Sequence, residues 1–143
     1  MLKGLNHITL SVRHLSRSLD YYTELLGFSL RARWSDGAYL TLGDLWLCLR
    51  RDAHVREGPL PEYTHFALSV VSADFDEFSR KVAEGAHPTW KKNRSEGESI
   101  YLLDPDGHKL EVHAGSLESR LAALRKEPHA GLVLYGEEHN AHE

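Results

Sequence analysis

The stretch His7-Ile8-Thr9-Leu10-Ser11-Val12 recurs in the second half of the chain as His65-Phe66-Ala67-Leu68-Ser69-Val70, with four identities in six positions. In both copies apolar and polar side chains alternate, a pattern typical of a half-buried strand. Each copy is followed by apolar residues at helical spacing, first Leu15, Leu19, Tyr22 and Leu26, then Val71, Phe75, Phe78 and Val82. A repeat with the same order of elements indicates two copies of one supersecondary unit.

Short strands complete each unit. The apolar runs that predict them are residues 28–34, 38–42 and 45–50 in the first unit and 100–103 and 109–113 in the second. The strong turn signal Asp104-Pro105-Asp106-Gly107 joins the last two as a hairpin. Residues 52–61 are polar and contain Pro and Gly, which predicts a linker between the units.

Helix ends and unit boundaries follow from the same pattern. Ser16 or Ser18 is expected to cap the start of the first helix, and Gly27 and Gly85 to end the two helices. We expect an α+β fold of tandem βαβββ modules, at about residues 1–58 and 62–115. A third helix is expected from Ser116, and the last residues, EEHNAHE, are expected to fray, within a C-terminal segment of residues 116–143.

Composition narrows the class of protein. The chain has 143 residues, 41% of them hydrophobic, which suffices for one compact domain with a proper core. A net charge of −4 gives no long-range attraction for nucleic acid or an anionic membrane, so neither is an expected partner. A single cysteine, Cys48, and the lack of a signal-peptide pattern or long apolar run predict a cytoplasmic protein. Cys48 itself is expected to pack or to line a pocket.

The repeat also suggests a metal site. His7 and His65 occupy equivalent positions on the polar faces of equivalent strands, and Glu111 lies on the polar face of the last strand. Two histidines and a carboxylate leave coordination positions open, as a catalytic metal requires. Counting four residues from the turn glycines leads to Glu111 in one unit and to Leu47 in the other, so no fourth ligand is expected.

The alternative for these side chains is structural. A lone histidine on a strand more often satisfies a local hydrogen bond than binds a metal. The repeat relationship favours the metal, and a carboxylate directed inward without a partner is costly. His108, in the turn, and His113, at the end of the strand, are weaker candidate ligands.

A second candidate site is a cationic loop, which contains Lys91, Lys92 and Arg94 interleaved with Asn93, Ser95, Gly97 and Ser99. Such a loop is ordinarily a solvated surface. Tyr101 on the adjacent strand and Arg120 on the apolar stripe of the third helix favour instead a pocket for a small, highly charged oxyanion. The pocket would adjoin the divalent cation.

These residues resemble a known family. His7, His65 and Glu111 on tandem βαβββ modules resemble the vicinal oxygen chelate superfamily, also described as glyoxalase, bleomycin resistance and dioxygenase proteins. More specific strings resemble its FosA-type fosfomycin-resistance glutathione transferases; these are NHITL, GAYL, LWLCL, YTH, KNRSEG and DPDGHKLE. The resemblance covers residues 1 to about 135, and the KNRSEG loop is its most discriminating part.

The resemblance implies an enzyme that uses Mn(II), is activated by K⁺ and adds the glutathione thiol to the epoxide of fosfomycin. Mn(II) would act as a Lewis acid on the epoxide oxygen. The resemblance also implies a homodimer with shared active sites, in which His7 of one chain joins His65 and Glu111 of its partner.

Residue roles follow by the same resemblance. The implied phosphonate ligands are Thr9, Lys91, Ser95, Ser99, Tyr101 and Arg120, with Trp46 lining the pocket. The implied potassium loop consists of Asn93, Ser95, Gly97 and Ser99. Trp34 and Tyr39 would line the thiol channel, and Thr9, Tyr39 and Arg120 would have catalytic roles, with Tyr39 assisting deprotonation of the thiol. The sequence departs from the family where glutathione would lie, at Asp36 and Arg50.

Other functions stay open at this point. Water in place of the thiol gives an epoxide hydrolase, and a different thiol gives a bacillithiol-type transferase. Two histidines and a carboxylate also suit a non-haem Fe(II) dioxygenase, for which the cationic loop would be superfluous. A non-catalytic antibiotic-binding module of the same fold would have no use for the metal ligands.

Overall fold

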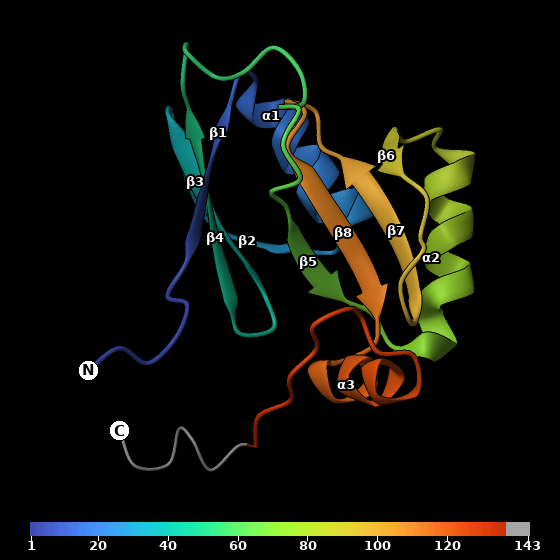
Figure 1. The fold of residues 1–143 in the computed structure, drawn as a ribbon. Helices are drawn as coiled ribbons and strands as arrows, with labels where there is room; N and C mark the ends of the chain where they lie inside the picture. The colour runs from blue at the N-terminus through green and yellow to red at the C-terminus, as the bar shows by residue number, and fades with distance from the viewer. Residues whose placement is uncertain (137–143) are drawn as a thin grey trace.

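Two four-stranded sheets, one from each repeat, stand side by side in the computed structural model, which describes residues 1–136 (Figure 1). The strand orders are β1-β4-β3-β2 and β5-β8-β7-β6. The first sheet contains β1 (Ile8–Val12), β2 (Ser29–Trp34), β3 (Gly37–Leu42) and β4 (Leu45–Arg51). The second contains β5 (Phe66–Ser69), β6 (Thr89–Lys91), β7 (Glu98–Leu103) and β8 (Lys109–Ala114). The predicted α+β fold and its repeat are confirmed.

The register of the sheets corrects one sequence prediction. In each sheet the repeated strand pairs in parallel with the last strand, and Thr9 lies opposite Cys48 as Ala67 lies opposite Glu111. Because Thr9 and Ala67 are equivalent in the repeat, the counterpart of Glu111 is Cys48 rather than Leu47. Counting from the turn glycines failed because each glycine lies two residues before its strand, but the register matches the fourth residue of β4 to the third residue of β8.

The core lies between the sheets and the helices. Leu47 and Leu49 of β4 and Leu110 and Val112 of β8 are buried there, together with Leu10 and Val12 of β1. Since successive side chains alternate across a strand, the intervening residues lie on the opposite, polar face of each sheet. The predicted alternation of β1 and β8 is confirmed.

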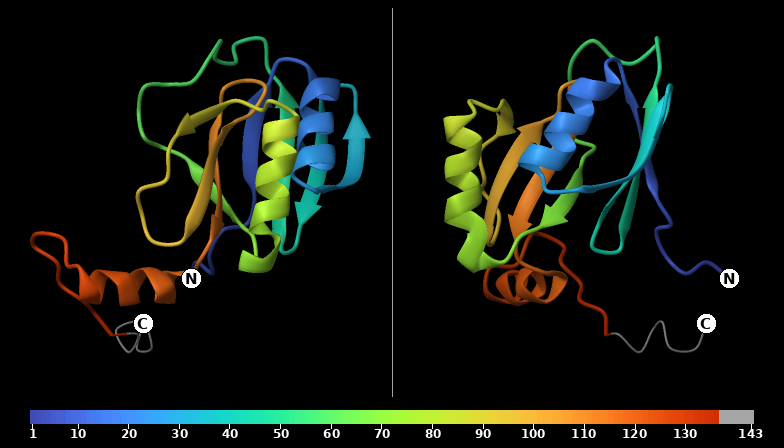
Figure 2. Two further views of the ribbon diagram at one scale, coloured as in Figure 1. Left: turned by 90° about the vertical axis from the view of Figure 1, so that its right-hand side faces the viewer. Right: turned by 180° about the vertical axis from the view of Figure 1, so that it is seen from behind.

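Helices cover one side of the two sheets (Figure 2). They are α1 (Leu15–Asp20), which continues as the π-helical turn η1 (Tyr21–Leu25), and α2 (Ser72–Glu84). The predicted caps of the first helix were wrong, because the N-cap is His14, whose side chain makes no capping hydrogen bond. Gly27, at φ +80°, directly follows the C-cap Leu26 of η1, and Gly85 is the C-cap of α2, as predicted. Val71 is the exposed N-cap of α2 rather than part of its buried stripe.

The third helix, α3 (Leu117–Lys126), lies across the ends of β5 and β8 (Figure 1). Ser116 caps it with a capping box, in which Ser116 and Ser119 exchange hydrogen bonds between side chain and backbone. None of its residues is buried, and Leu117 is 69% exposed. The predicted frayed tail, residues 137–143, lies outside the described residues.

The turn between β7 and β8 joins the two modules. Asp104 accepts hydrogen bonds from the backbone N–H groups of Asp106 and His108 at 2.9 Å and from the Tyr22 hydroxyl at 2.7 Å. His108 Nε2 lies 2.7 Å from the backbone oxygen of Ser11. These contacts give Asp104 and His108 structural roles at the junction between the modules. Within residues 1–136, no helix has the length and apolar character needed to span a membrane.

Candidate functional site

The two predicted metal ligands of the second sheet lie together. His65, just before β5, places Nε2 3.1 Å from Oε1 of Glu111 on β8. Glu111 is 7% exposed, so its carboxylate is withdrawn from solvent. Nδ1 of His65 lies 2.8 Å from the carbonyl oxygen of Tyr63, which accepts a hydrogen bond and thereby fixes the Nδ1–H tautomer. In the neutral ring, Nε2 then presents a lone pair toward the carboxylate, an arrangement that a divalent cation satisfies.

Glu111 is held in its charged form. Burial raises the pKa of Glu111, but the hydrogen bond from Ser99 and the nearby His65 and His113 outweigh this and leave the pKa below its usual value. The Ser99 hydroxyl donates to Oε2 of Glu111 at 2.5 Å and lies 2.6 Å from Nδ1 of His113. Ser99 has one proton and gives it to the carboxylate, so it accepts from His113. A fixed, ionised carboxylate is what a metal ligand requires.

A cation, the ammonium of Lys91, lies on the same face of the sheet, two strands away from Glu111. The register runs from Lys91 on β6 to Tyr101 on β7 and on to Glu111 on β8. The Lys91 ammonium donates to the Tyr63 hydroxyl and lies 4.7 and 4.9 Å from the ring centres of Tyr63 and Tyr101. The hydrogen bond to Tyr63 raises the pKa of Lys91, which stays charged. Two aromatic faces and a hydroxyl therefore hold this ammonium in place.

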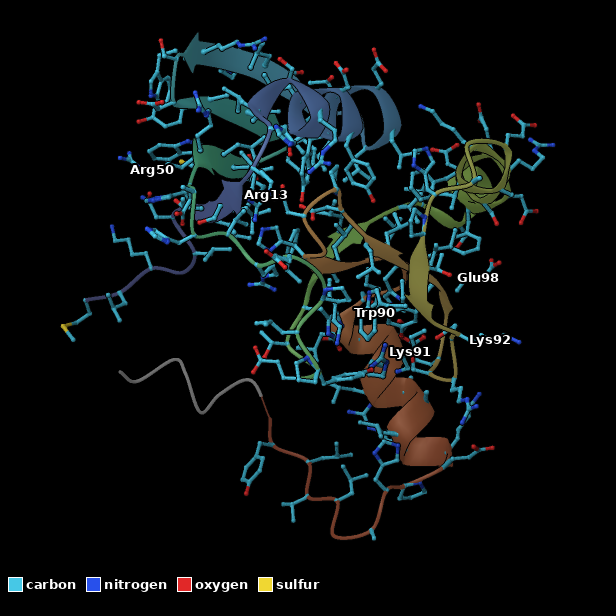
Figure 3. The ribbon with its side chains drawn as sticks, turned by 90° about the horizontal axis from the view of Figure 1, so that it is seen from above. Arg13, Arg50, Trp90, Lys91, Lys92 and Glu98 are labelled. Carbon is cyan, nitrogen blue, oxygen red and sulfur yellow. The ribbon has the colours of Figure 1, made fainter. Side chains whose placement is uncertain are left out.

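Only some of the cations in the cationic loop lie near the His65–Glu111 pair. Lys91 lies among the side chains above α3, whereas Lys92 points away from the molecule (Figure 3). Arg94 is exposed as well. The loop closes on itself through Asn93, which donates to the carbonyl oxygen of Gly97 at 2.7 Å and accepts from the backbone N–H and hydroxyl of Ser95 at 3.1 Å. Three of the four residues predicted to bind K⁺ thus converge in one loop.

Arg120 of α3 reaches this loop. Its Nε lies 3.2 Å from Oε1 of Glu96, and its Nη2 lies 3.5 Å from the Ser95 hydroxyl. The predicted oxyanion ligands of the second sheet therefore surround one side of the His65–Glu111 pair; they are Lys91, Ser95, Ser99, Tyr101 and Arg120. We call these five residues, together with His65 and Glu111, the second half-site.

The remaining predicted residues lie on the polar face of the first sheet. His7 is exposed and packs against Trp46, with 4.5 Å between ring centres. The ring centres of Trp46 and Tyr39 are 5.3 Å apart, and those of Tyr39 and Trp34 are 4.8 Å apart. An aromatic row therefore runs from the predicted thiol channel to the predicted metal ligand His7. Thr9 lies in register with Cys48 and, beyond it, Tyr39. We call His7, Thr9, Trp34, Tyr39 and Trp46 the first half-site.

Two details of this face concern ligands. The indole N–H of Trp46 is buried and has no hydrogen-bond partner within the described residues. Beside the first half-site, a hollow of about 370 Å³ is lined by Arg13, Asp36, Arg50, Arg51, Asp52 and Ala53. Asp36 forms an ion pair with Arg51 at 3.7 Å. Two other residues that line the hollow, Arg13 and Arg50, are labelled in Figure 3. Cations thus lie at the end of the aromatic row.

One chain does not bring the two half-sites together. Among residues 1–136 of a single chain, no three histidine, cysteine or acidic side chains form a group that could hold a metal. His65 and Glu111 meet, whereas His7 lies against Trp46 on the other sheet. The donors present suit a divalent cation, with His65 in the correct tautomer and Glu111 ionised. The third ligand, from a second chain, stays a prediction.

The sequence analysis missed four residues of the second half-site's surroundings. They are Tyr63, Trp90, Glu96 and His113, the last considered only as a weak ligand. Trp90 packs edge-on against His65 at 5.3 Å and Tyr101 at 5.2 Å, and its N–H donates to the Leu110 carbonyl oxygen at 3.2 Å. The alternation of β6 to β8 carried the signal for His113, because it shares the polar face with Glu111. Tyr63, Trp90 and Glu96 lie in irregular segments or a short strand, where alternation gives no direction.

Comparison with known proteins agrees with this geometry. Residues 4–112 match the model of the Glyoxalase/Bleomycin resistance protein/Dioxygenase superfamily. The chain is 51% identical over 140 residues to glutathione transferase FosA of Serratia marcescens, covering 96% of this chain and 99% of that protein. It is 34% identical over 139 residues to metallothiol transferase FosB of Staphylococcus haemolyticus, covering 94% and 100%.

Solved structures give the same assignment. The hexagonal form of the fosfomycin resistance protein FosX of Listeria monocytogenes matches with a TM-score of 0.71 and 29% identity, over 84% of this chain and 99% of that one. A mutant of the same FosX, complexed with Mn(II) and 1S,2S-dihydroxypropylphosphonic acid, matches with a TM-score of 0.74 and 26% identity, over 85% and 99%. The chain therefore belongs to the Glyoxalase/Bleomycin resistance protein/Dioxygenase superfamily, as its repeat and motifs predicted.

Proposed function

We propose that this protein is a glutathione transferase that inactivates fosfomycin by adding the glutathione thiol to its epoxide ring. The observation that carries the proposal is the second half-site. It contains Lys91, Tyr101, Ser99 and Arg120, which would hold an oxyanion, and a His–carboxylate pair suited to a divalent cation. Fosfomycin carries its phosphonate on one of the two carbon atoms of the epoxide ring, so the phosphonate and the epoxide oxygen can match the two parts together. The 51% identity to glutathione transferase FosA supports glutathione as the cosubstrate.

We further propose a homodimer in which the first half-site of one chain completes the second half-site of its partner. Support comes from the division of the predicted residues between two sheets and from the predicted ligand His7, which is exposed beside Trp46. A symmetric pairing would bring His7 to the partner's His65 and Glu111, because a two-fold interface uses the same surfaces of both chains. Thr9 and Trp46 would then close the pocket.

In this pocket the chain's own residues bind and orient the substrates. Lys91 and Arg120 would hold the phosphonate together with Tyr101, Ser99, Ser95 and Thr9, and so fix the electrophilic carbon for attack. Mn(II), which His7, His65 and Glu111 would bind, supplies a Lewis acid for the epoxide oxygen. Asn93, Ser95, Gly97 and Ser99 would bind K⁺ as the second cofactor.

The aromatic row would guide the thiol to the pocket. Trp34 and Tyr39 would line the channel, and the Tyr39 hydroxyl would assist deprotonation of the glutathione sulfur. Glutathione carries two carboxylates and one ammonium group. The arginines and Asp36 of the hollow beside this row offer the complementary charges.

The test is product formation. Purified protein is mixed with Mn(II), K⁺, fosfomycin and glutathione, and the product is identified by mass spectrometry, with water alone, cysteine and bacillithiol as controls. The expected result is a one-to-one glutathione adduct that forms in the complete mixture. A diol with water alone would identify an epoxide hydrolase, and faster addition of another thiol would identify a different transferase. Protection without product would identify a drug-binding module.

A further inference from the structure

Glu96 is a carboxylate inside the cationic loop, and the proposed function has not accounted for it. Its Oε1 atom lies 3.2 Å from Nε of Arg120, 3.2 Å from the Ser119 hydroxyl and 3.4 Å from Nε2 of His113. A negative charge beside a pocket for a doubly charged phosphonate weakens binding by simple repulsion. A role that outweighs this repulsion is therefore required.

The surroundings of Glu96 are built around its carboxylate. The side chain is 17% exposed, and Nε of Arg120 and the Ser119 hydroxyl donate to one of its oxygens, with Nε2 of His113 beside it. Two glycines leave the room that it needs. A Cβ on Gly115 would lie 3.1 Å from Oε1 of Glu96, and one on Gly97, at φ +74°, would lie 2.9 Å from Cε1 of His113. Burial raises the pKa of Glu96, but hydrogen bonds from Arg120, Ser119 and His113 leave it below the usual value.

The contact with Arg120 uses the inner nitrogen of the guanidinium. A guanidinium is planar and has donors on two edges, so a partner at Nε sets the direction of the plane. The Arg120 side chain is 41% exposed on the outer helix α3, where an unrestrained arginine would adopt many rotamers. Glu96 removes that freedom and leaves the terminal nitrogens for another anion.

Resting on the proposed function, we propose that Glu96 is a positioning residue, which orients the Arg120 guanidinium so that its terminal nitrogens face the phosphonate. Through His113 and Ser99 the same carboxylate is linked to Glu111. One chain of contacts therefore ties the oxyanion fork to the metal ligand and sets the distance between them. This distance would select the substrate, because only a molecule with an oxyanion and a metal-binding oxygen at matching spacing can contact Arg120 and the metal at once.

The direction of the effect on binding tests the proposal. Repulsion alone predicts that Glu96→Ala binds fosfomycin more tightly, whereas positioning predicts weaker binding. We expect the KM for fosfomycin to rise roughly 10- to 100-fold in Glu96→Ala, as for loss of a charge-assisted contact. The KM for glutathione should change less than about twofold. Glu96→Asp should restore part of the affinity.

The matched control is Glu98→Ala, which removes an equal charge from an exposed neighbour on β7 (Figure 3). It should leave the KM for fosfomycin within about twofold of the wild-type value. A double-mutant cycle with Arg120→Ala isolates the route, since Glu96→Ala should add little once the guanidinium is gone. Tighter binding in Glu96→Ala, or full additivity with Arg120→Ala, would overturn the proposal.

Direct binding separates this proposal from the proposed function. Calorimetry with the Mn(II)-loaded protein gives affinities for fosfomycin and for inorganic phosphate, without turnover. If the wild type binds these anions but forms no glutathione adduct, the transferase function fails and the affinity ratio still decides the role of Glu96. If the wild type binds neither, the positioning proposal fails too. Should Glu96→Ala not fold, the isosteric Glu96→Gln decides, with weaker binding expected.

Discussion

His65 and Glu111 lie 46 residues apart in the sequence, yet Nε2 and Oε1 approach to 3.1 Å. The parallel pairing of β5 with β8 brings them together, and the Tyr63 carbonyl and the Ser99 hydroxyl fix their orientations. Tyr63 and Ser99 hold the two predicted metal ligands in place without binding the metal themselves, as hydrogen-bond partners of metal ligands do in many proteins. Metal affinity should therefore depend on these outer contacts as well as on the ligands themselves.

Ser99→Ala should weaken Mn(II) binding. Its hydroxyl donates to Oε2 of Glu111 at 2.5 Å and so holds the carboxylate in place. Loss of such an outer contact typically lowers metal affinity about 10- to 100-fold. The measurement is Mn(II) titration followed by electron paramagnetic resonance, without fosfomycin, so that any contact of Ser99 with substrate does not contribute. Unchanged affinity would show that Ser99 does not support the metal ligand.

Lys91→Met should raise the KM for fosfomycin roughly 10- to 100-fold, because a charge-assisted contact with the phosphonate is lost. Lys92→Met is the control, since this neighbour carries the same charge but is exposed and points away (Figure 3). It should leave the KM within about twofold. Steady-state kinetics at constant ionic strength gives both values. Equal effects of the two substitutions would point to a diffuse field rather than a binding contact.

Gly107→Ala should destabilise the fold more than Gly43→Ala. Both glycines have positive φ, +85° and +55°. A Cβ at Gly107 would lie 2.7 Å from the backbone of Gly58 and Pro59 in the linker, whereas nothing lies within 4 Å at Gly43. We expect losses of more than about 2 kcal/mol and of about 1 kcal/mol, respectively, in the free energy of unfolding. Urea denaturation measures both, and equal losses would argue against the close approach.

Asp104 should make stability depend on pH in an unusual direction. Burial raises the pKa of Asp104, and the nearby His108 together with hydrogen bonds from Tyr22 and the turn offsets this in part. The folded state therefore takes up this proton before the unfolded state does as pH falls. As pH falls from the raised pKa of the folded state to the ordinary value of about 4, the contribution of Asp104 to the free energy of unfolding increases.

Asp104→Asn removes this ionisation and keeps one oxygen as an acceptor for the turn. The stability difference between wild type and variant should shift toward the wild type as pH falls through that window. Urea denaturation at a series of pH values measures it, and the other carboxylates cancel in the difference. A difference that stays constant with pH, or shifts the other way, would contradict the raised pKa.

The sequence predicted those features that depend on periodicity. The recurrence of His7 at His65 indicated two matching sheets, and alternation placed Glu111 on the face opposite Leu110 and Val112. Features that depend on strand register or tertiary contact could not be predicted. The counterpart of Glu111 was misplaced at Leu47 because Glu111 is the third residue of β8, whereas its counterpart in the register, Cys48, is the fourth residue of β4. Serines near the first helix suggested caps, yet the helix begins at Leu15, after His14.

The candidate site divides in the same way. Residue chemistry indicated Lys91 and Arg120, but it did not distinguish Lys91 from Lys92, since only the structure gives the direction of each side chain. No role was predicted for Glu96, because a carboxylate is not expected in an anion-binding site and its contact with Arg120 is visible only in the structure. Tyr63 orients His65 through a backbone carbonyl, which no side-chain pattern encodes.

Subunit complementation tests the shared metal centre most directly. His7→Ala and Glu111→Gln should each abolish formation of the glutathione adduct. When equal amounts are unfolded, mixed and refolded, half of the dimers contain one chain of each kind. In a site built from two chains, each mixed dimer has one intact site, so activity should return to about a quarter of the wild-type value. If mass spectrometry of the intact dimers shows mixed pairs and the sample stays inactive, the shared His7, His65 and Glu111 centre is contradicted.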